Sequence, residues 1–387
     1  MPVRATKRGA ARTPLHGDVD VLICGASFAG LAVARELSAT GASVLVLDRY
    51  EIGERQTSAC AAPTEWLRHL GLERSVLQTF GSLLLHTPRA HARWPLPWTF
   101  STFAYRELCA LLWDQRGPGT EFETAKVEGV VRGGGEAIGV RTDRGELRAP
   151  LVIDALGWRR VLGTGDPVQP PDARLSRGLE VHPGGTGDDL ELWIDKAVIP
   201  AGYGWSFPAR DELRVGIGSF EPRDHVKEPT VALAAGLGLP PEGYQGNWIP
   251  HRLRPATGGG VFFVGDSAGH CLPLTAEGIR TAFYFGIAAG RELRAVLAGT
   301  RGRAAALERY RRFSAGHRWK YEWMLTTQNV VPKLSPRGLA AMTRTFGHPG
   351  PAHWAFGHYG RITPPSFALP APPAAARRSA GRAALAA

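Results

Sequence analysis

The chain lacks the features that would indicate a membrane span, a metal site or a secreted protein. No apolar run reaches the roughly 18 residues that a membrane-spanning helix needs. The four cysteines are scattered without a C-x-x-C pair, which argues against a zinc site or a disulfide framework and fits a reducing compartment. The basic N-terminus is not followed by the apolar stretch of a secretory signal. These absences predict a cytoplasmic protein that binds no metal.

Acidic residues are missing from both ends of the chain. Residues 1–17 carry four basic side chains and residues 323–387 carry seven, and together they account for the net charge of +11. The charges of the intervening residues cancel to a net charge of zero. The sequence therefore predicts no basic groove through a core and no nucleic-acid partner. The basic ends could dock peripherally on anionic lipid headgroups. Solvated tails are the simpler interpretation.

The first strong pattern is a strand, turn, helix and second strand near the N-terminus. A buried strand at 19–24 leads to Gly25, and the second strand ends in Asp48. Gly25 and Gly30 stand at the first and third positions of G-x-G-x-x-G, with Ser27 in place of the middle glycine. Amides at the start of the helix favour a pyrophosphate, and Asp48 stands where an acid binds a ribose hydroxyl. The unit predicts a dinucleotide site. A tight turn in an α/β core is the alternative.

Two later strands also end beside chemically useful residues. The strand at 151–155 leads to Gly157, which allows backbone to pass close to a nucleotide. The strand at 261–264 is followed by Asp266, which should face the same crevice as the first turn. A carboxylate in that place can accept hydrogen bonds from ribityl hydroxyls. A structural cap at Asp266 is the alternative.

These three motifs, in this order, resemble those of the flavoprotein group that contains aromatic hydroxylases, flavin-dependent halogenases and geranylgeranyl reductases. The resemblance covers residues 19–296 and implies that the cofactor is FAD. Free amides at the start of the helix near Gly278 would then stabilise negative charge on the flavin as it is reduced. The residues implied in cofactor binding are Gly25, Ala26, Ser27, Phe28, Ala29, Gly30, Asp48, Arg49, Cys60, Ala61, Val127, Gly157, Asp266, Gly278 and Ile279.

A fourth pattern, Y-x-W-x-F-P followed by two glycines, concerns the substrate. In a strand, Tyr203, Trp205 and Phe207 share one face and form an apolar wall, while Gly216 and Gly218 leave room beside it. The spacing is similar to the lipid-site signature of geranylgeranyl reductases, whereas halogenases carry a related W-x-W-x-I-P. Aromatic residues that only fill a core are the alternative.

Cys60 lies where geranylgeranyl reductases have a cysteine near the flavin, although Ala61 replaces their following glycine. The resemblance implies that this thiol gates the site or protects the flavin ring, and a small apolar filler is the alternative. The arginine with which this group contacts FAD is not found in register. Tyr105 stands at its position and Arg106 is one step away. Further candidates for the site, each more simply explained as structural, are His182, His270 and Arg280.

We predict an α/β protein with a discontinuous Rossmann-like domain that is interrupted by antiparallel sheet. Short alternating stretches between 175 and 220 lack a βαβ rhythm and include a short strand at 198–199. Residues 82–100, with three prolines, predict irregular strands, and apolar spacing predicts helices at 278–296 and 303–330. The predicted segments are a disordered basic N-terminus (1–17), an FAD-binding domain (18–165 and 255–300), an inserted substrate-binding domain (166–254), a C-terminal helical region (301–365) and a disordered tail (366–387).

The resemblance implies an oxidoreductase that reduces C=C bonds of a geranylgeranyl-like or other apolar lipid by hydride transfer from N5 of reduced FAD. NAD(P)H or an electron-carrier protein is the implied donor. No second G-x-G-x-x-G is visible, so a nicotinamide would lack a fold of its own. An FAD-dependent monooxygenase or halogenase that acts on an aromatic or natural-product substrate is one alternative. A non-catalytic flavin or lipid carrier is the other.

Overall fold

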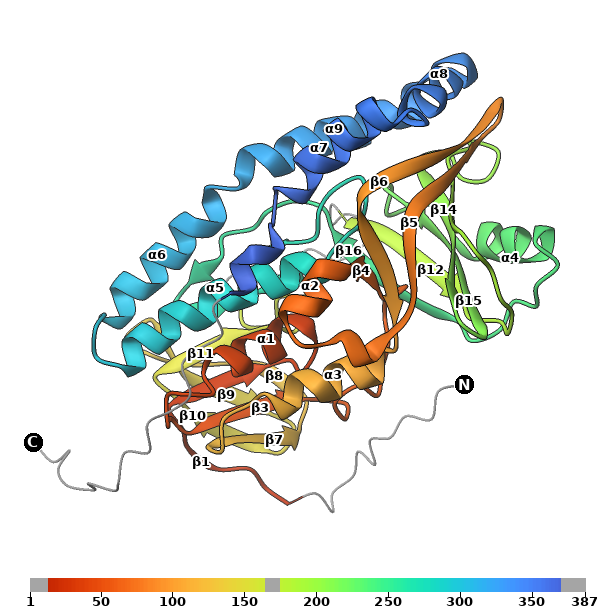
Figure 1. Ribbon diagram of the computed structural model, residues 1–387. Coiled ribbons are helices and arrows are strands. Elements are labelled where there is room, and N and C mark those ends of the chain that lie inside the picture. Colours follow the sequence, from red (N-terminus) through yellow and green to blue (C-terminus); the bar gives the residue numbers. More distant parts are fainter. Residues whose placement is uncertain (1–12, 164–174, 370–387) are drawn as a thin grey trace, which may run out of the picture.

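A computed structural model describes residues 13–163 and 175–369 of the chain (Figure 1). The predictions made for 1–12, for 166–174 and for 370–387 lie outside these residues. Ordered structure nevertheless extends into both ends that the sequence predicted to be disordered. The short strand β1 (Gly17–Asp18) pairs with a later strand, and the 3-10 helix η4 (Pro365–Ala368) packs on the helical layer.

The nucleotide-binding pattern folds into a six-stranded sheet. Its strands are β17 (Thr257–Gly258), β18 (Val261–Phe263), β11 (Leu151–Asp154), β2 (Val21–Cys24), β3 (Val44–Asp48) and β7 (Thr120–Thr124), in that spatial order. All neighbours run parallel except β17, so the carboxyl ends of five strands meet at one edge. The predicted strands at 19–24, 44–48, 151–155 and 261–264 are therefore confirmed, and they are adjacent in the sheet.

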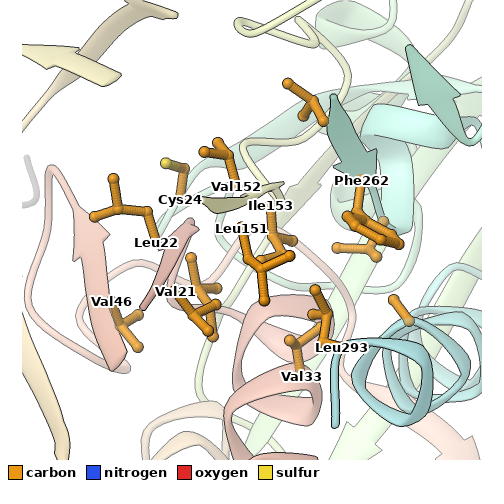
Figure 2. Close-up of a cluster of buried hydrophobic side chains, with 14 of the residues drawn as sticks. Val21, Leu22, Cys24, Val33, Val46, Leu151, Val152, Ile153, Phe262 and Leu293 are labelled. Carbon is orange, nitrogen blue, oxygen red and sulfur yellow. The ribbon is translucent and has the colours of Figure 1, made fainter. Parts of the chain in front are cut away.

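The core of this domain lies between the parallel sheet and two helices. The helices α1 (Phe28–Glu36) and α5 (Ile279–Leu297) pack against each other on one face of the sheet. Figure 2 shows Val33 and Leu293 of these helices beside the side chains of β2 and β11. Every residue of β2 is fully buried, which explains the continuous apolar run, because parallel strands are covered on both faces.

A second, mainly antiparallel sheet completes this domain, and only β1 runs parallel to its neighbour β10. It contains β8 (Val127–Gly133), β9 (Glu136–Thr142) and β10 (Gly145–Arg148), with β1 at its edge. The strands β8 and β9 form a hairpin that turns at Gly134 and Gly135. Ala137, Val140 and Leu147 bury their side chains in the same apolar cluster as the parallel sheet.

The third sheet has eight strands. In spatial order they are β16 (Gln245–Pro250), β12 (Leu175–Val181), β15 (Glu212–Ser219), β14 (Gly202–Ala209), β13 (Leu190–Trp193), β5 (Val76–Thr87), β6 (Ala90–Phe103) and β4 (Ala61–Pro63). The predicted antiparallel insert supplies β12 to β16, and α4 (Lys227–Gly236) packs on β15 and β12. The strands β4, β5 and β6 come from within 18–165 and cross over to join this sheet (Figure 1).

The hairpin β5–β6 bears out the irregular strands predicted for 82–100. It is long, but its register shifts near Phe80, and residues 96–99 lie outside the pairing with β5. Pro95 and Pro97 are accommodated because β4 pairs with β6 only at Phe100 to Thr102, so both prolines lie where β6 is an edge strand. The short strand predicted at 198–199 is wrong, since this segment is a turn whose amides bond to the carbonyl oxygen of Asp195.

Helices form the rest of the molecule. Near the N-terminal half these are α2 (Thr64–His69), α3 (Tyr105–Asp114) and the 3-10 turn η1 (Glu73–Ser75). The predicted helix 303–330 divides into α6 (Arg303–Ala315) and α7 (Arg318–Val330), followed by η3 (Val331–Lys333), α8 (Pro336–Phe346) and α9 (Pro349–Gly360). Ser335 caps α8 by accepting a hydrogen bond from the amide of Gly338, and Pro336 suits the first helical position. None of the described helices is long and apolar enough to cross a bilayer.

Candidate functional site

The turn between β2 and α1 is closely packed and requires both glycines of the motif. Gly25 has a φ of +113°, and a Cβ there would lie 2.3 Å from the carbonyl oxygen of Ala155. A Cβ at Gly30 would lie 1.9 Å from the carbonyl oxygen of Gly25. The first turn of α1 therefore lies directly on the turn backbone, which keeps the helix amides close to the sheet edge.

Ser27 and Tyr105, the two residues that replace a glycine and an arginine of the flavoprotein motifs, contact each other. Ser27 precedes α1 without making a side-chain capping bond, and its hydroxyl accepts a hydrogen bond from the Tyr105 hydroxyl at 3.2 Å. Tyr105 is buried, whereas Arg106 is exposed. The first residue of α3 thus reaches the nucleotide turn with a neutral phenol in place of a guanidinium.

Asp48 lies at the carboxyl end of β3, beside this turn. Its carboxylate accepts hydrogen bonds from the amides of Ala26 (2.9 Å) and Tyr50 (3.1 Å). Burial raises the pKa of Asp48, while these two amides oppose the increase. Its position fits the predicted contact with a ribose hydroxyl.

Asp154 and Ser267 tie two of the predicted motifs together. The Asp154 carboxylate accepts hydrogen bonds from the amides of Leu156 and Leu162 and from the Ser267 hydroxyl (2.7 Å). Ser267 belongs to the 3-10 turn η2 (Gly265–Ala268), which follows β18. Gly157, in the loop after β11, has a φ of +82°, and a Cβ there would meet no atom within 4 Å. The backbone at Gly157 is therefore open on that side.

Asp266 lies in η2 without a hydrogen-bond donor among the residues that the structure describes. Burial raises its pKa to about 6, and the charge of Arg254 opposes this. Asp266 is half-buried, so its carboxylate remains open to hydrogen bonds from a ligand. A Cβ at Gly265 would lie 3.1 Å from that of Ala29, so this turn adjoins the first turn of α1. The unpartnered carboxylate and the open backbone at Gly157 fit the sugar-alcohol and phosphate portions of FAD.

The loop before α5 is held in an unusual conformation. Leu274 and Ala276 both have positive φ values, which are uncommon for residues with a side chain. The amide of Leu274 donates to Gln328 of α7 at 2.8 Å, and the Tyr203 hydroxyl donates to the Thr275 carbonyl at 2.7 Å. Contacts from α7 and β14 therefore place this loop and the start of α5 at Gly278 and Ile279.

Arg280 acts within this loop as a structural cation. It is almost fully buried, and its Nε lies 2.8 Å from an oxygen of Glu277. The Tyr359 hydroxyl of α9 donates to the same carboxylate, and the Arg280 guanidinium stacks 4.2 Å from the Tyr359 ring. Tyr359 could not be predicted as part of this group, because its partners lie about 80 positions away in the chain.

Other predicted residues have structural surroundings. The ring of Phe28 packs edge-on against Phe283 (5.8 Å between centroids), and Val127 is part of the domain core. The Arg49 guanidinium lies over the Tyr50 ring at 4.9 Å. His270 stacks on Phe285 at 3.7 Å, and burial lowers its pKa well below the ordinary value, so it is neutral.

Cys60 immediately precedes β4 with a φ of +51° and is fully buried. Burial raises the pKa of its thiol well above the ordinary value, so the thiol is neutral and a weak nucleophile. Its carbonyl oxygen accepts hydrogen bonds from the amide of Phe103 (3.0 Å) and from Arg214 (3.2 Å). The same Arg214 nitrogen contacts the carbonyl oxygens of Ala59 (2.8 Å) and Phe103 (3.1 Å), so one buried side chain from β15 fixes this loop.

The aromatic residues of β14 lie on one face of the eight-stranded sheet, as the spacing predicted. Opposite Trp205 in the register are Gly216 on β15 and Leu192 on β13. The Trp205 indole lies over Gly216, where an added Cβ would come within 2.3 Å of the ring, and it reaches 3.5 Å from the Cβ position of Gly218. The room that the glycines leave is therefore filled by Trp205 itself.

The same sheet face continues into residues that the sequence analysis did not assign to a site. On β6, alternate residues are apolar and covered, and they are Ala92, Trp94, Leu96, Trp98 and Phe100. The C-terminal helices α8 and α9 pack over them. Trp94 contacts the ring of Phe346 at 5.2 Å and donates its indole N–H to the carbonyl oxygen of Thr343. The period-2 alternation of residues 92–100 was the available signal, and the prolines obscured it.

A buried chain of charges lies on this face next to Trp205. The Trp205 indole donates to Glu180 at 3.3 Å, and Glu180 bonds to His182 at 2.9 Å. His182 lies 3.2 Å from Glu212, which accepts a hydrogen bond from Arg214 at 2.8 Å. The four charges alternate in sign and sum to zero.

This arrangement determines how its members ionise. Burial alone would lower the pKa of His182, but its hydrogen bonds to Glu180 and Glu212 raise it to about 9. Burial would raise the pKa of Glu212, yet His182 and Arg214 together lower it to about 2. His182 is thus an imidazolium at neutral pH. The predicted site residue His182 is joined through Arg214 to the loop of Cys60.

Comparison with known proteins agrees with this geometry. Residues 18–83 match the family model of an FAD binding domain. A digeranylgeranylglycerophospholipid reductase of Haloferax volcanii is 28% identical over 51% of this chain and 53% of its own length. A digeranylgeranylglycerophospholipid reductase of Methanopyrus kandleri is 26% identical over 84% of this chain and 89% of its own length. The chain thus spans about half of the first relative and most of the second.

Two solved structures share the fold. A geranylgeranyl bacteriochlorophyll reductase-like protein of Thermoplasma acidophilum has a TM-score of 0.78 at 18% identity, covering 91% of this chain and 98% of its own. A probable FAD-dependent monooxygenase of Pseudomonas aeruginosa has a TM-score of 0.66 at 19% identity, covering 85% of this chain and 100% of its own. At these identities the structures establish the fold alone.

These matches identify an FAD binding domain at residues 18–83 and show that the chain is similar to digeranylgeranylglycerophospholipid reductases. The α/β fold with its inserted antiparallel sheet, the helical C-terminal region and FAD as cofactor are confirmed.

Proposed function

We propose that this protein reduces C=C bonds of an apolar, prenyl-type substrate, which the aromatic face of the eight-stranded sheet receives. Reduced FAD supplies the hydride, from N5, when it is bound. The observation that carries the proposal is the hydrogen bond from Tyr203 to the Thr275 carbonyl, because it joins the aromatic strand to the loop that begins α5. The match with the Methanopyrus kandleri reductase over most of both chains supports the same substrate class.

The apolar face would exclude water and orient the substrate. Trp205 is held flat by its contact with Gly216 and by its bond to Glu180, so its ring presents a fixed surface. Phe207 lies on the same face of β14. Beyond them, Leu192 of β13 continues this surface, and its register partner Leu85 of β5 is fully buried where the surface ends. A flexible hydrocarbon chain requires such a surface, because only apolar contact and shape can position it.

The chain's own groups would hold FAD from one edge of the parallel sheet. In this proposal the amides of residues 26–30 bind the pyrophosphate, and Asp48 binds the ribose. Asp266 would accept hydrogen bonds from the ribityl hydroxyls. The amides at Gly278 and Ile279 would stabilise negative charge as the cofactor is reduced. Cys60, as a neutral thiol, would contribute shape and not nucleophilicity.

The experiment is reduction of the bound FAD by light without oxygen, followed by addition of a geranylgeranyl compound. Flavin absorbance should return to the oxidised spectrum, and the product should gain two hydrogens per bond reduced. A saturated analogue of the same chain length is the matched control and should leave the flavin reduced. Comparison of NADPH, NADH and a reduced carrier protein in place of light would identify the donor, which we propose to be NAD(P)H or such a protein.

A variant tests the observation on which the proposal depends. Tyr203→Phe removes the bond to Thr275 and keeps the ring, so the FAD content should be unchanged while flavin reoxidation by substrate slows up to about tenfold. Tyr244→Phe, an exposed tyrosine at the edge of the sheet, should leave the rate unchanged. If no polyprenyl compound reoxidises the flavin, the substrate class is wrong. Turnover that requires oxygen and hydroxylates or halogenates an aromatic compound would establish the monooxygenase or halogenase alternative.

A further inference from the structure

The helix α7 is apolar on two opposite sides. Its inner face buries Tyr321 and Met324 in the core that also holds α5. Its outer face exposes Trp319 (69%), Trp323 (63%) and Val330 (48%). The spacing of four and then seven residues places these three side chains along one line of the helix. Large exposed rings in a row are unusual on a surface that meets only water.

The neighbouring helix α9 exposes a further tryptophan. Trp354 is 65% exposed, and its ring lies 4.7 Å from that of His358. Both helices contact the loop before α5, since Gln328 of α7 bonds to Leu274 and Tyr359 of α9 bonds to Thr275. The Lys320 ammonium of α7 reaches the carbonyl oxygen of Ile362 just beyond α9, and Ile362 lies in the same buried cluster as Tyr321. The two helices are thus anchored to one core while both expose tryptophan.

This part of the protein is also positively charged. Between 318 and 369 the only acid is Glu322. The basic residues of this segment are Arg318, Lys320, Lys333, Arg337, Arg344 and Arg361. Exposed tryptophan beside lysine and arginine is the combination that suits a membrane interface, where the indole lies at headgroup depth and the cations meet anionic lipid.

We propose that the outer face of α7 forms a docking surface for an anionic phospholipid bilayer, with Trp319 and Trp323 entering the headgroup region. The docking is peripheral, since the described helices include none that could span the bilayer. A second copy of this chain is a poor occupant, because a symmetric contact through this surface would bring two basic patches together. The proposal does not depend on which reaction the FAD site catalyses.

The test uses the FAD-loaded protein and sedimentation with lipid vesicles. One set of vesicles contains phosphatidylcholine alone, and the other contains phosphatidylcholine mixed with phosphatidylglycerol. The wild-type protein should bind the anionic vesicles more strongly, and added salt should weaken that binding. The double variant Trp319→Ala, Trp323→Ala should lower the partition coefficient about tenfold or more. Tyr244→Ala, an exposed aromatic on the sheet outside this surface, is the matched control and should bind as the wild type does.

Two further measurements keep the result interpretable. The FAD content and the thermal midpoint of the double variant should equal those of the wild type, because both tryptophans are exposed. Flavin reoxidation by a short, water-soluble substrate should also be unchanged, which separates this proposal from the proposed function. Equal binding of wild type and double variant to anionic vesicles would overturn the docking surface. Conversion of a dimer into a monomer by the same substitutions, with no change in vesicle binding, would show that the surface joins two copies.

Discussion

Replacement of His182 by glutamine tests the buried charge chain beside Trp205. In the folded protein the imidazolium lies between Glu180 and Glu212, and its side chain is only 6% exposed. These carboxylates raise the pKa of His182 to about 9, whereas the unfolded chain has the ordinary value near 6.5. Glutamine can donate to one carboxylate but carries no charge.

The sign of the effect follows from the raised pKa. Below about pH 6.5 both states are protonated, and the full stabilisation is present. Between pH 6.5 and 9 only the folded state holds the proton, so the stabilisation falls as the pH rises, and above pH 9 it is absent. The pKa difference corresponds to about 3 kcal/mol, and the partial exposure of Glu212 (39%) reduces this to about 2 kcal/mol through solvent screening.

The assay is urea unfolding of wild type and His182→Gln at several pH values from 6 to 9.5. Tryptophan fluorescence monitors the unfolding. The difference in free energy of unfolding between the two proteins should be about 2 kcal/mol larger at the acid end of this range. Subtracting the two curves removes the contributions of His270 and His317, whose pKa values are lowered by burial. A titration of the His182 ring by NMR would give the pKa directly.

A difference that stays constant across this range would refute the reasoning, because it would mean that His182 is not held as an imidazolium. An NMR pKa at or below 6.5 would have the same meaning. If the difference in free energy of unfolding between wild type and His182→Gln is large but the same at every pH, His182 stabilises the fold by packing alone. In that case the loop of Cys60 would owe its position to Arg214 alone.

Three other changes have definite expected outcomes. Gly216→Ala would place a Cβ 2.3 Å from the Trp205 ring, so it should lower the free energy of unfolding by about 1–3 kcal/mol. The control is Gly236→Ala, where the new Cβ would meet no atom within 4 Å. This control should raise the free energy of unfolding by up to about 1 kcal/mol. Asp266→Ala removes an unpartnered carboxylate, so the dissociation constant of FAD should rise about ten- to a hundredfold in a fluorescence titration, and an unchanged affinity would remove Asp266 from the cofactor site. Gly30→Ala would put a Cβ 1.9 Å from a carbonyl oxygen of the nucleotide turn, so the purified protein should lose its yellow colour, and full FAD occupancy would contradict the tight-turn argument.

Local sequence was sufficient for the parallel sheet and its turns. Residues 21–24 are buried on both faces, and that burial demands an unbroken apolar run that can be recognised without the fold. Gly25 and Gly30 are recognisable for a similar reason, since the close approach of helix and strand excludes any side chain. The alternation of Tyr203, Trp205 and Phe207 also predicted a shared face correctly, because side chains alternate in every strand.

Only the tertiary structure decided which surfaces meet. A periodic pattern records that a face is covered but not what covers it, so the packing of α8 and α9 on β6 could not be predicted from residues 92–100. The bond between Tyr105 and Ser27 joins positions 78 apart, and that of Arg214 to Cys60 joins positions 154 apart. Such contacts depend on how separate segments fold back onto one another, and that information is spread over the whole chain. Composition and spacing therefore predicted which edge of the sheet faces the cofactor, while the charge chain beside Trp205 and the exposed tryptophans emerged from the folded arrangement.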